Sequence, residues 1–326
     1  MKASTREFVI GLACALSVVV LWSSFHLISR VGVQTSLTPY DLVMLRVGIG
    51  GIIMLPVVLR YGLGHLRLWQ AIILAVVAGP GFALPAFTGY QFAPAAHGAA
   101  ILAGTLPLFT VPIACLALGE QLNIIRLLGL LTLFAGVVFL IGDSFTDYND
   151  DKWRGDALFI VGAIDWSIFA VLARAWRVEP VRGTALVAVI SLIGYVPLHF
   201  AFLPTKLATA PLIDIGGQAV YQGFLSMIIS LLLFTRAVGA LGASLTTMIT
   251  AFVPITSALS ALVILGEPLT IFTVFAIILV TIGIFGAVSS GRPAGPAVNA
   301  RAYAHWWKTL IKTLIRRLPM GGWRCM

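Results

Sequence analysis

Ten stretches of mostly apolar residues, each of about 20 residues, follow one another along this chain of 326 residues. Such a segment spans the hydrocarbon core of a bilayer as an α-helix, because a helix satisfies every backbone polar group within the segment. The sequence therefore predicts an all-α integral membrane protein with ten transmembrane helices. The predicted helices cover residues 8–30, 40–60, 70–93, 97–118, 125–142, 156–176, 184–203, 215–237, 243–265 and 270–290.

The composition and motifs exclude several other classes of protein. Charged residues make up 10% of the chain, whereas a soluble domain carries about 25%. The net charge of +9 does not indicate a nucleic-acid partner, because the basic residues lie between and after the apolar stretches. No metalloprotease, nucleophile-elbow or phosphate-loop signature occurs, so we expect no enzyme, no metal and no cofactor. The first apolar run continues to Val31 without a clear cleavage site, which favours a retained helix over a signal peptide.

The lysines and arginines of the short connections predict the orientation in the membrane. With the N-terminus in the cytoplasm, most of these residues fall on the cytoplasmic side. Both termini are then cytoplasmic, and the acidic loop at 143–155 is periplasmic. We therefore expect a multi-pass protein of the bacterial inner membrane. The basic residues left on the outer side are Arg30, Lys152, Arg154 and Lys206.

Two phrases occur twice at nearly one offset, which indicates a duplicated unit. Each half, residues 8–142 and 156–290, then contains five helices. Because five is odd, the second half is expected to be inverted in the membrane relative to the first. The paired phrases are LWSSFHLISR (21–30) with DWSIFAVLAR (165–174), and LPLFTVPIACLALGEQLNI (106–124) with VPITSALSALVILGEPLTI (253–271).

These duplicated phrases resemble the EamA family of the drug/metabolite transporter superfamily. The resemblance rests on W-S-x-F near the start of each half, on proline followed by L-G-E, and on the segment at 221–244. It implies ten helices in two five-helix repeats, both ends in the cytoplasm, and transport of small metabolites. This chain departs from the pattern in two ways: the second half has no histidine matching His26, and a basic extension follows residue 290.

Inverted repeats predict a central substrate site near the membrane midplane, which two alternating states expose to either side. Pro107 and Pro254 occupy matching positions in the two halves and are expected to bend their helices. Pro254 also frees the carbonyl of Thr250, which is then available to a ligand. A plain bend without ligand contact is the alternative.

Aromatic residues near the start of each half are candidate walls of this site. Trp22 and His26 share one helix face, as do Trp166 and Phe169. Such rings would stack on flat substrates or hold cations. Packing between helices is the alternative role. Polar contacts to the substrate are expected from Tyr221, Gln222 and Thr250, because Gln222 in particular is costly to bury in a membrane.

Ionisable side chains within predicted helices point to function, because each costs roughly 2.5–3.5 kcal/mol to insert. Asp165 and His26 flank equivalent tryptophans, so both are candidates for substrate binding and for proton coupling. The alternative is a structural role, in which Asp165 or a backbone carbonyl satisfies Arg46. His97 is expected to be a helix-boundary residue and His199 an interfacial one. Glu120 and Glu267, which follow glycines, are expected to be caps or gate hinges.

The C-terminal extension at 291–326 is predicted to be a flexible link followed by a basic amphipathic helix at 304–318. Apolar residues follow one face of that helix and basic residues the other, which predicts binding to anionic lipid at the cytoplasmic surface. A protein partner for this helix is the alternative. The remaining expected partners are a small-molecule substrate and membrane lipid, with the chain a monomer or homodimer.

Together these features predict a membrane transporter of small organic metabolites that works by alternating access. The family resemblance favours export of amino acids or related compounds. An importer or exchanger of a cationic amine, and a channel or lipid-handling protein of the same fold, are the alternatives.

Overall fold

The computed structural model describes residues 5–119, 122–145 and 151–289. These ranges contain helices and no β-strand, and ten helical spans are long and apolar enough to cross a membrane. The prediction of ten transmembrane helices is therefore confirmed, and the chain is a multi-pass membrane protein. Glu120, residues 146–150 of the acidic loop, and the link and basic helix at 291–326 lie outside the described residues.

Seven spans are single helices and three are composite. The single helices are α1 (Thr5–Thr35), α2 (Pro39–Tyr61), α5 (Ala95–Leu118), α6 (Ile124–Ser144), α7 (Lys152–Ala175), α8 (Pro180–Phe202) and α13 (Ile271–Ser289). The third span consists of α3 (Leu68–Val76), the π-type η1 (Val77–Gly81) and α4 (Phe82–Phe92). The eighth consists of α9 (Leu212–Gln218), the π-type η2 (Ala219–Ile229) and α10 (Ser230–Leu241). The ninth consists of α11 (Ala243–Thr250), α12 (Val253–Ser260) and the π-type η3 (Ala261–Leu265).

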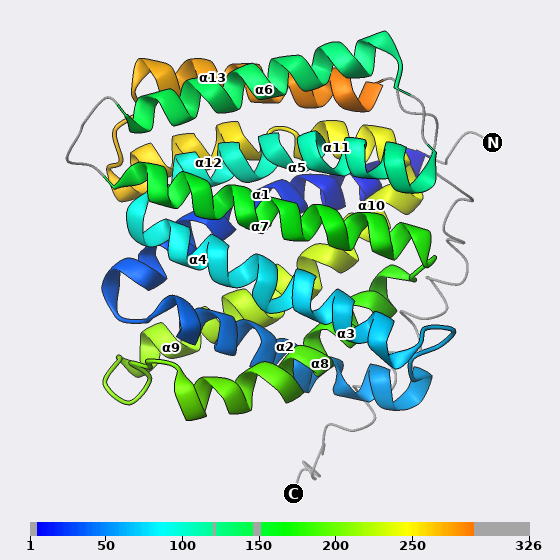
Figure 1. Ribbon diagram of the computed structural model, residues 1–326, viewed down its shortest axis with the longest axis vertical. Helices are drawn as coiled ribbons and strands as arrows, with labels where there is room; N and C mark the ends of the chain where they lie inside the picture. Colours follow the sequence, from blue (N-terminus) through cyan, green and yellow to red (C-terminus); the bar gives the residue numbers. More distant parts are fainter. Residues whose placement is uncertain (1–4, 120–121, 146–150, 290–326) are drawn as a thin grey trace, which may run out of the picture.

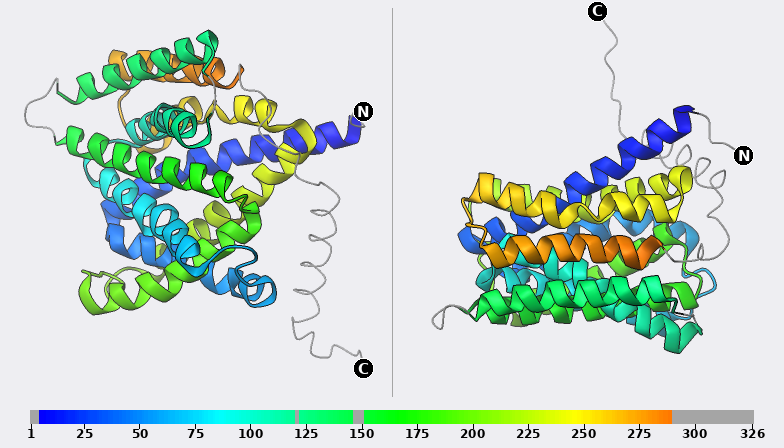
Figure 2. Two further views of the ribbon diagram at one scale, coloured as in Figure 1. Left: turned by 45° about the vertical axis from the view of Figure 1, so that its right-hand side comes forward. Right: turned by 90° about the horizontal axis from the view of Figure 1, so that it is seen from above.

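The helices form one bundle with their ends gathered at two opposite ends (Figure 1). The pair α6 and α13 lies at one edge of the bundle, and α2 and α8 lie at the other; α1 slants through the interior (Figure 2). We call the end where α6 ends and α7 begins the acidic-loop end. The same end holds the connections α1–α2, α4–α5, α8–α9 and η3–α13.

The repeated L-G-E phrase ends two spans in the same way. α5 ends before Gly119, whose φ is 68°, and η3 ends before Gly266, whose φ is 66°. A residue after the last helical turn often adopts this left-handed backbone, which glycine enters without a steric penalty. The two glycines therefore have one structural role, which accounts for their recurrence in the sequence.

Breaks in the helical geometry fall at related places in the two halves. In the third span, Gly79 has non-helical φ and ψ of −88° and −108°, and Pro80 follows it. The eighth span, which is third in its half, has π-type turns over 219–229. The ninth span breaks after Thr250, and Pro254 lies in the first turn of α12. The matching Pro107 lies within the unbroken α5.

Glycines bring α6 and α13 into backbone contact. A Cβ built on Gly136 would lie 3.0 Å from the Ala276 carbonyl oxygen, and one built on Gly283 would lie 2.9 Å from the Gly129 carbonyl oxygen. The repeat aligns Gly136 with Gly283 and Gly129 with Ala276. The Gly136–Ala276 contact and the Gly283–Gly129 contact are therefore equivalent, with the roles of α6 and α13 exchanged. Such equivalence is expected where a two-fold axis relates the two helices. Small residues permit such close approach between membrane helices.

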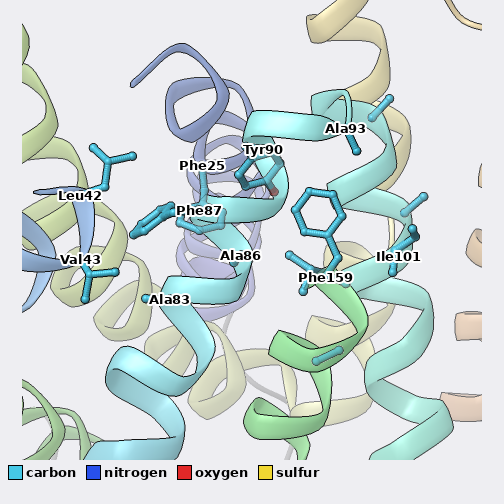
Figure 3. Packing of buried hydrophobic residues seen from close by; sticks show 14 of the residues in the cluster. Phe25, Leu42, Val43, Ala83, Ala86, Phe87, Tyr90, Ala93, Ile101 and Phe159 are labelled. Atoms are coloured by element: carbon cyan, nitrogen blue, oxygen red, sulfur yellow. The ribbon is translucent and has the colours of Figure 1, made fainter. Parts of the chain in front are cut away.

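An aromatic core joins helices of both halves. Figure 3 shows Phe25 of α1 next to Phe87 and Tyr90 of α4, with Phe159 of α7 beside Tyr90. The ring centroids of Tyr90 and Phe159 are 4.7 Å apart, and those of Phe25 and Phe87 are 5.8 Å apart. Aromatic pairs at these separations add to the packing energy. This core holds the inner face of α1 in place, and the candidate site lies along that face.

Candidate substrate site

Polar side chains of η2 face α1 in the interior of the bundle. The Tyr221 hydroxyl donates to the Leu21 carbonyl oxygen at 2.6 Å, and Gln222 Nε2 donates to Ser29 Oγ at 3.1 Å. Gln222 is fully buried, and its Oε1 receives no hydrogen bond within the described ranges. Two predicted contact residues therefore lie together, and one of them keeps an unused acceptor.

Arg46 of α2 lies against the same segment. Its side chain is buried, and Nη1 donates to Ser226 Oγ at 3.0 Å. Its guanidinium carbon lies 5.5 Å from the Phe25 ring centroid, within cation–π range. Among the described residues it has no carboxylate partner, so the alternative of a pair with Asp165 is not found. Arg46 was not among the predicted site residues, although a single charged residue within an apolar helix indicates a functional position.

His26 of α1 is buried between α1 and α4. Its Nδ1 forms a hydrogen bond with the Tyr90 hydroxyl, and its ring packs edge-on against Phe25. The imidazole is therefore part of the aromatic core, with one ring nitrogen already engaged. A substrate or proton would have to compete with Tyr90 for that nitrogen.

The two tryptophans of the repeated phrase have separate aromatic partners. Trp22 stacks on Phe234 of α10, with ring centroids 5.3 Å apart. Trp166 contacts Phe82 of α4 at 4.8 Å and Phe169 at 5.3 Å. Both tryptophans are partly exposed. They do not form one aromatic cage, and each instead packs against a phenylalanine of the other half.

Asp165 of α7 lies beside the break in the third span. A Cβ built on Gly81 would lie 3.1 Å from Asp165 Oδ2, so the glycine allows the carboxylate to approach the helix. Asp165 is partly exposed and has no hydrogen bond or ion pair within the described part of the chain. Such a carboxylate at the middle of a membrane span is available to a proton or a cation.

Thr250 is buried at the break between α11 and α12. Its hydroxyl donates to the Thr247 carbonyl oxygen at 3.0 Å, within the same helix. This hydroxyl is thus satisfied locally.

A cavity of about 560 Å³ lies between α1 and the α9–η2 segment. Its lining includes Gly32 and Ile28 of α1 together with Gln218 and Tyr221. Exposed residues such as Ile213 and Val220 also line it, whereas Gln222 and Arg46 do not, so it is an open groove beside the polar face of the eighth span. No group of three or more His, Cys, Asp or Glu side chains suited to a metal ion occurs in the described ranges.

An ion pair crosses between the halves at the acidic-loop end. Arg30 Nε lies 3.0 Å from Glu267 Oε1, and both side chains are mostly buried. Glu267 Oε2 also accepts from the backbone N–H of Ala95, the first residue of α5. Arg30 donates in addition to the Tyr90 carbonyl oxygen. Glu267 thus caps one helix and pairs with another, which matches its expected place at a helix end.

Replacing Glu267 with glutamine is expected to cost about 1–2 kcal/mol of unfolding free energy, because a partly buried charge pair is lost while one acceptor oxygen remains. The measurement is unfolding of the purified protein in mixed micelles. Glu7→Gln is the matched control, since Glu7 pairs with Arg236 between α1 and α10 in an exposed position. That change should cost less than about 0.5 kcal/mol. Equal losses in the two variants would contradict the assignment.

A second charge cluster joins four helices at the same end. His97 Nδ1 lies 3.0 Å from Asp156 Oδ1, and Nε2 lies 3.4 Å from Asp143 Oδ2. Thr270 donates to Asp143 Oδ1 at 2.8 Å, and Ser144 donates to Asp156 Oδ2. His97 lies in the first turn of α5, as expected for a boundary residue, but it is buried with both aspartates.

A third contact pairs Asp41 at the start of α2 with His199 near the end of α8. His199 Nε2 lies 3.3 Å from Asp41 Oδ1, without the alignment of a hydrogen bond. Asp41 also accepts from Thr205 Oγ1 at 2.6 Å and from the Lys206 backbone N–H at 3.0 Å. His199 lies in the last turn of α8 with its side chain fully buried within the protein, and its position at the membrane interface stays a prediction.

The fold defines an all-helical, multi-pass membrane protein with buried polar groups in its interior. Residues 9–142 and 153–289 match the model of the EamA-like transporter family. The chain therefore belongs to that family, and the resemblance seen in the sequence is confirmed.

Similar proteins carry the same general description. The chain is 26% identical over 235 residues to the uncharacterized transporter YyaM of Bacillus subtilis, covering 71% of this chain and 75% of that protein. It is 28% identical over 286 residues to an uncharacterized transporter of Clostridium kluyveri, covering 79% and 86%. A solved crystal structure with 20% identity superposes with a TM-score of 0.60 over 86% of this chain and 98% of the other, which supports the fold.

Proposed function

We propose that this protein is a carrier of the bacterial inner membrane that moves small organic metabolites by alternating access, with export of amino acids or related compounds as its activity. The observation that carries the proposal is the group of buried polar side chains where η2 faces α1 and α2. Tyr221, Gln222 and Arg46 lie there in a protein of a transporter family. Buried polar groups at membrane depth are costly and are retained where a substrate uses them.

Alternating access is supported by the relation between the two halves. The third span of each half carries a break, over 77–81 and over 219–229. The reciprocal glycine contacts between α6 and α13 fit a two-fold axis that relates inverted repeats. Irregular helices near a central site and two related halves are the features that rocking-type carriers share. The polar contacts between halves at the acidic-loop end fit a state closed on that side, with the termini in the cytoplasm.

The test is counterflow in proteoliposomes. Vesicles are loaded with one unlabelled compound at a time from aromatic, aliphatic and sulfur amino acids, purines and small amines, and uptake of trace label is followed. Saturable, transient accumulation of one class is the expected result, because a carrier exchanges substrate across the membrane and a channel does not. Absence of counterflow across the whole panel, with folded protein, would overturn the carrier proposal.

Asp165→Asn is expected to abolish stimulation by a pH gradient while leaving counterflow at equal pH within about twofold. The Asp165 carboxylate beside Gly81, which has no ion-pair partner in the described ranges, is the proposed proton carrier. A gradient of one pH unit supports up to about tenfold accumulation for each coupled proton, since one unit corresponds to about 1.36 kcal/mol. The control is Asp151→Asn, at an exposed carboxylate just before α7. A pH response that survives in Asp165→Asn would assign coupling to another group.

A further inference from the structure

Arg46 is a buried cation with fewer hydrogen-bond acceptors among the described residues than its guanidinium has donors. Its side chain is 8% exposed, and within the described residues it makes one hydrogen bond, to Ser226 Oγ. A guanidinium has five N–H donors in a planar fork that matches a carboxylate. Burial of a charge in a membrane protein is costly unless a counter-charge is present at some stage of its function. The contact with the Phe25 ring supplies only part of that compensation.

The unused groups nearby have complementary chemistry. Gln222 lies one turn before Ser226 on η2, and its Oε1 is buried with no hydrogen-bond donor among the described residues. Arg46 therefore offers unused donors and a positive charge, while Gln222 offers an unused acceptor. An α-amino acid carries the matching pair, a carboxylate and an ammonium group separated by one carbon atom.

An open groove lies beside the same segment of η2, although Gln222 and Arg46 are not among its lining residues. It is lined by Gln218 and Tyr221, and Tyr221 directly precedes Gln222 in the chain. Its volume of about 560 Å³ falls in the range of small-molecule sites. Gly32 of α1 permits the eighth span to approach α1 closely, because a Cβ built on Gly32 would lie 2.6 Å from Gln218 Nε2.

We propose that Arg46 binds the carboxylate of the transported substrate and that Gln222 Oε1 accepts from its amino group. This inference rests on the proposed function, because it names the substrate class of that same site. It makes the carboxylate, and not the side chain of the substrate, the main determinant of recognition. Arg46 replaces the contact to Ser226 with a two-point contact to the carboxylate when substrate is bound.

The experiment uses probes that differ by one charged group. Purified full-length protein is tested with phenylalanine, 3-phenylpropionate and phenethylamine, and with leucine, 4-methylvalerate and isoamylamine. Counterflow and thermal stabilisation in detergent are both measured. We expect the amino acid to bind best, the acid less well, and the amine at least about tenfold more weakly than the amino acid, because hydrogen bonds to charged groups contribute about 1.5–3 kcal/mol.

Arg46→Gln should abolish the preference for each amino acid over the corresponding amine. It should also raise the KM for the amino acid at least about tenfold. Arg46→Lys should be intermediate, because it keeps the charge but not the planar fork. Ser226→Ala should keep the preference, which provides a second variant if Arg46→Gln folds poorly. Arg60→Gln, with the same chemical change at an exposed position on α2, is the matched control.

Each outcome decides the inference. Exchange of the amino acids with an unaltered KM and an unaltered preference over the amines in Arg46→Gln would overturn it while the carrier proposal stands. Stabilisation by the carboxylates that is lost in Arg46→Gln, without counterflow of any probe, would support the carboxylate site and overturn the carrier. Neither binding nor counterflow of any probe would overturn both. A merely structural role for Arg46 predicts a loss of stability with an unchanged preference among the three probes.

Discussion

Replacing His97 with alanine is expected to lower the free energy of unfolding by about 3–5 kcal/mol, because the change removes the imidazole that lies between two buried carboxylates. The imidazole lies between Asp143 and Asp156, and all three side chains are at most 3% exposed. The measurement is unfolding in mixed micelles, followed by helix content. Such a loss would be a large part of the stability of most proteins.

Two further variants separate electrostatics from packing at His97. Asp156→Asn in the His97→Ala background should recover part of the stability, because it removes one of the two facing charges. His65→Ala is the control, since His65 is an exposed histidine whose Nε2 lies 2.7 Å from the Trp176 carbonyl oxygen. It should cost less than about 1 kcal/mol. If His97→Ala loses no more than this control, the cluster is not a stabilising charge network.

The His97 cluster has a second consequence because it crosses between the halves. His97 and Asp143 lie on α5 and α6, helices of the first half, whereas Asp156 belongs to the second. Arg30–Glu267 and Asp41–His199 also join the two halves at the acidic-loop end. Opening of that end, as alternating access requires, would therefore have to separate or rearrange buried charges. Loss of His97 should consequently alter the balance between states as well as stability.

The transmembrane spans were predictable from sequence, because each span carries its own signal of length and hydrophobicity. The repeated L-G-E phrase was equally readable, since Gly119 and Gly266 each follow the end of a helix. The π-type turns of η2 were not predicted, because the segment carries no proline and is as apolar as its neighbours. Its geometry depends on how it packs against α1 and α2.

The charge contacts were less predictable than the spans. His97 and Asp156 are far apart in the sequence, and the position of each near a helix end gave no indication of its partner. The same holds for Asp41 and His199. Arg46 could be recognised as unusual, but its actual neighbours, Phe25 and Ser226, come from other spans and were not foreseen. The two repeated tryptophans were readable as equivalent, yet their ring partners differ between the halves.

Replacing Gly129 with leucine is expected to prevent stable assembly of α6 with α13, with a loss above about 4 kcal/mol. A Cβ at this position would lie 2.4 Å from the Ala287 backbone nitrogen, and 2.7 Å from the carbonyl carbon of Gly286. Backbone atoms of a helix cannot move aside as a flexible side chain can, so the whole helix must shift. The measurement is the amount of folded protein in membranes, together with its unfolding in mixed micelles.

Gly142→Leu is the matched control for this change, because a Cβ at Gly142, on the same helix, meets no atom of the described residues within 4 Å. Both substitutions raise intrinsic helix propensity by a similar amount, so the difference between them reports the α6–α13 contact alone. The repeat adds a further expectation. Ala276 is the counterpart of Gly129 and its carbonyl oxygen faces Gly136, so Gly136→Leu should be damaging in the same way. Tolerance of Gly129→Leu and Gly136→Leu at the level of Gly142→Leu would contradict a reciprocal backbone contact as the link between the two halves.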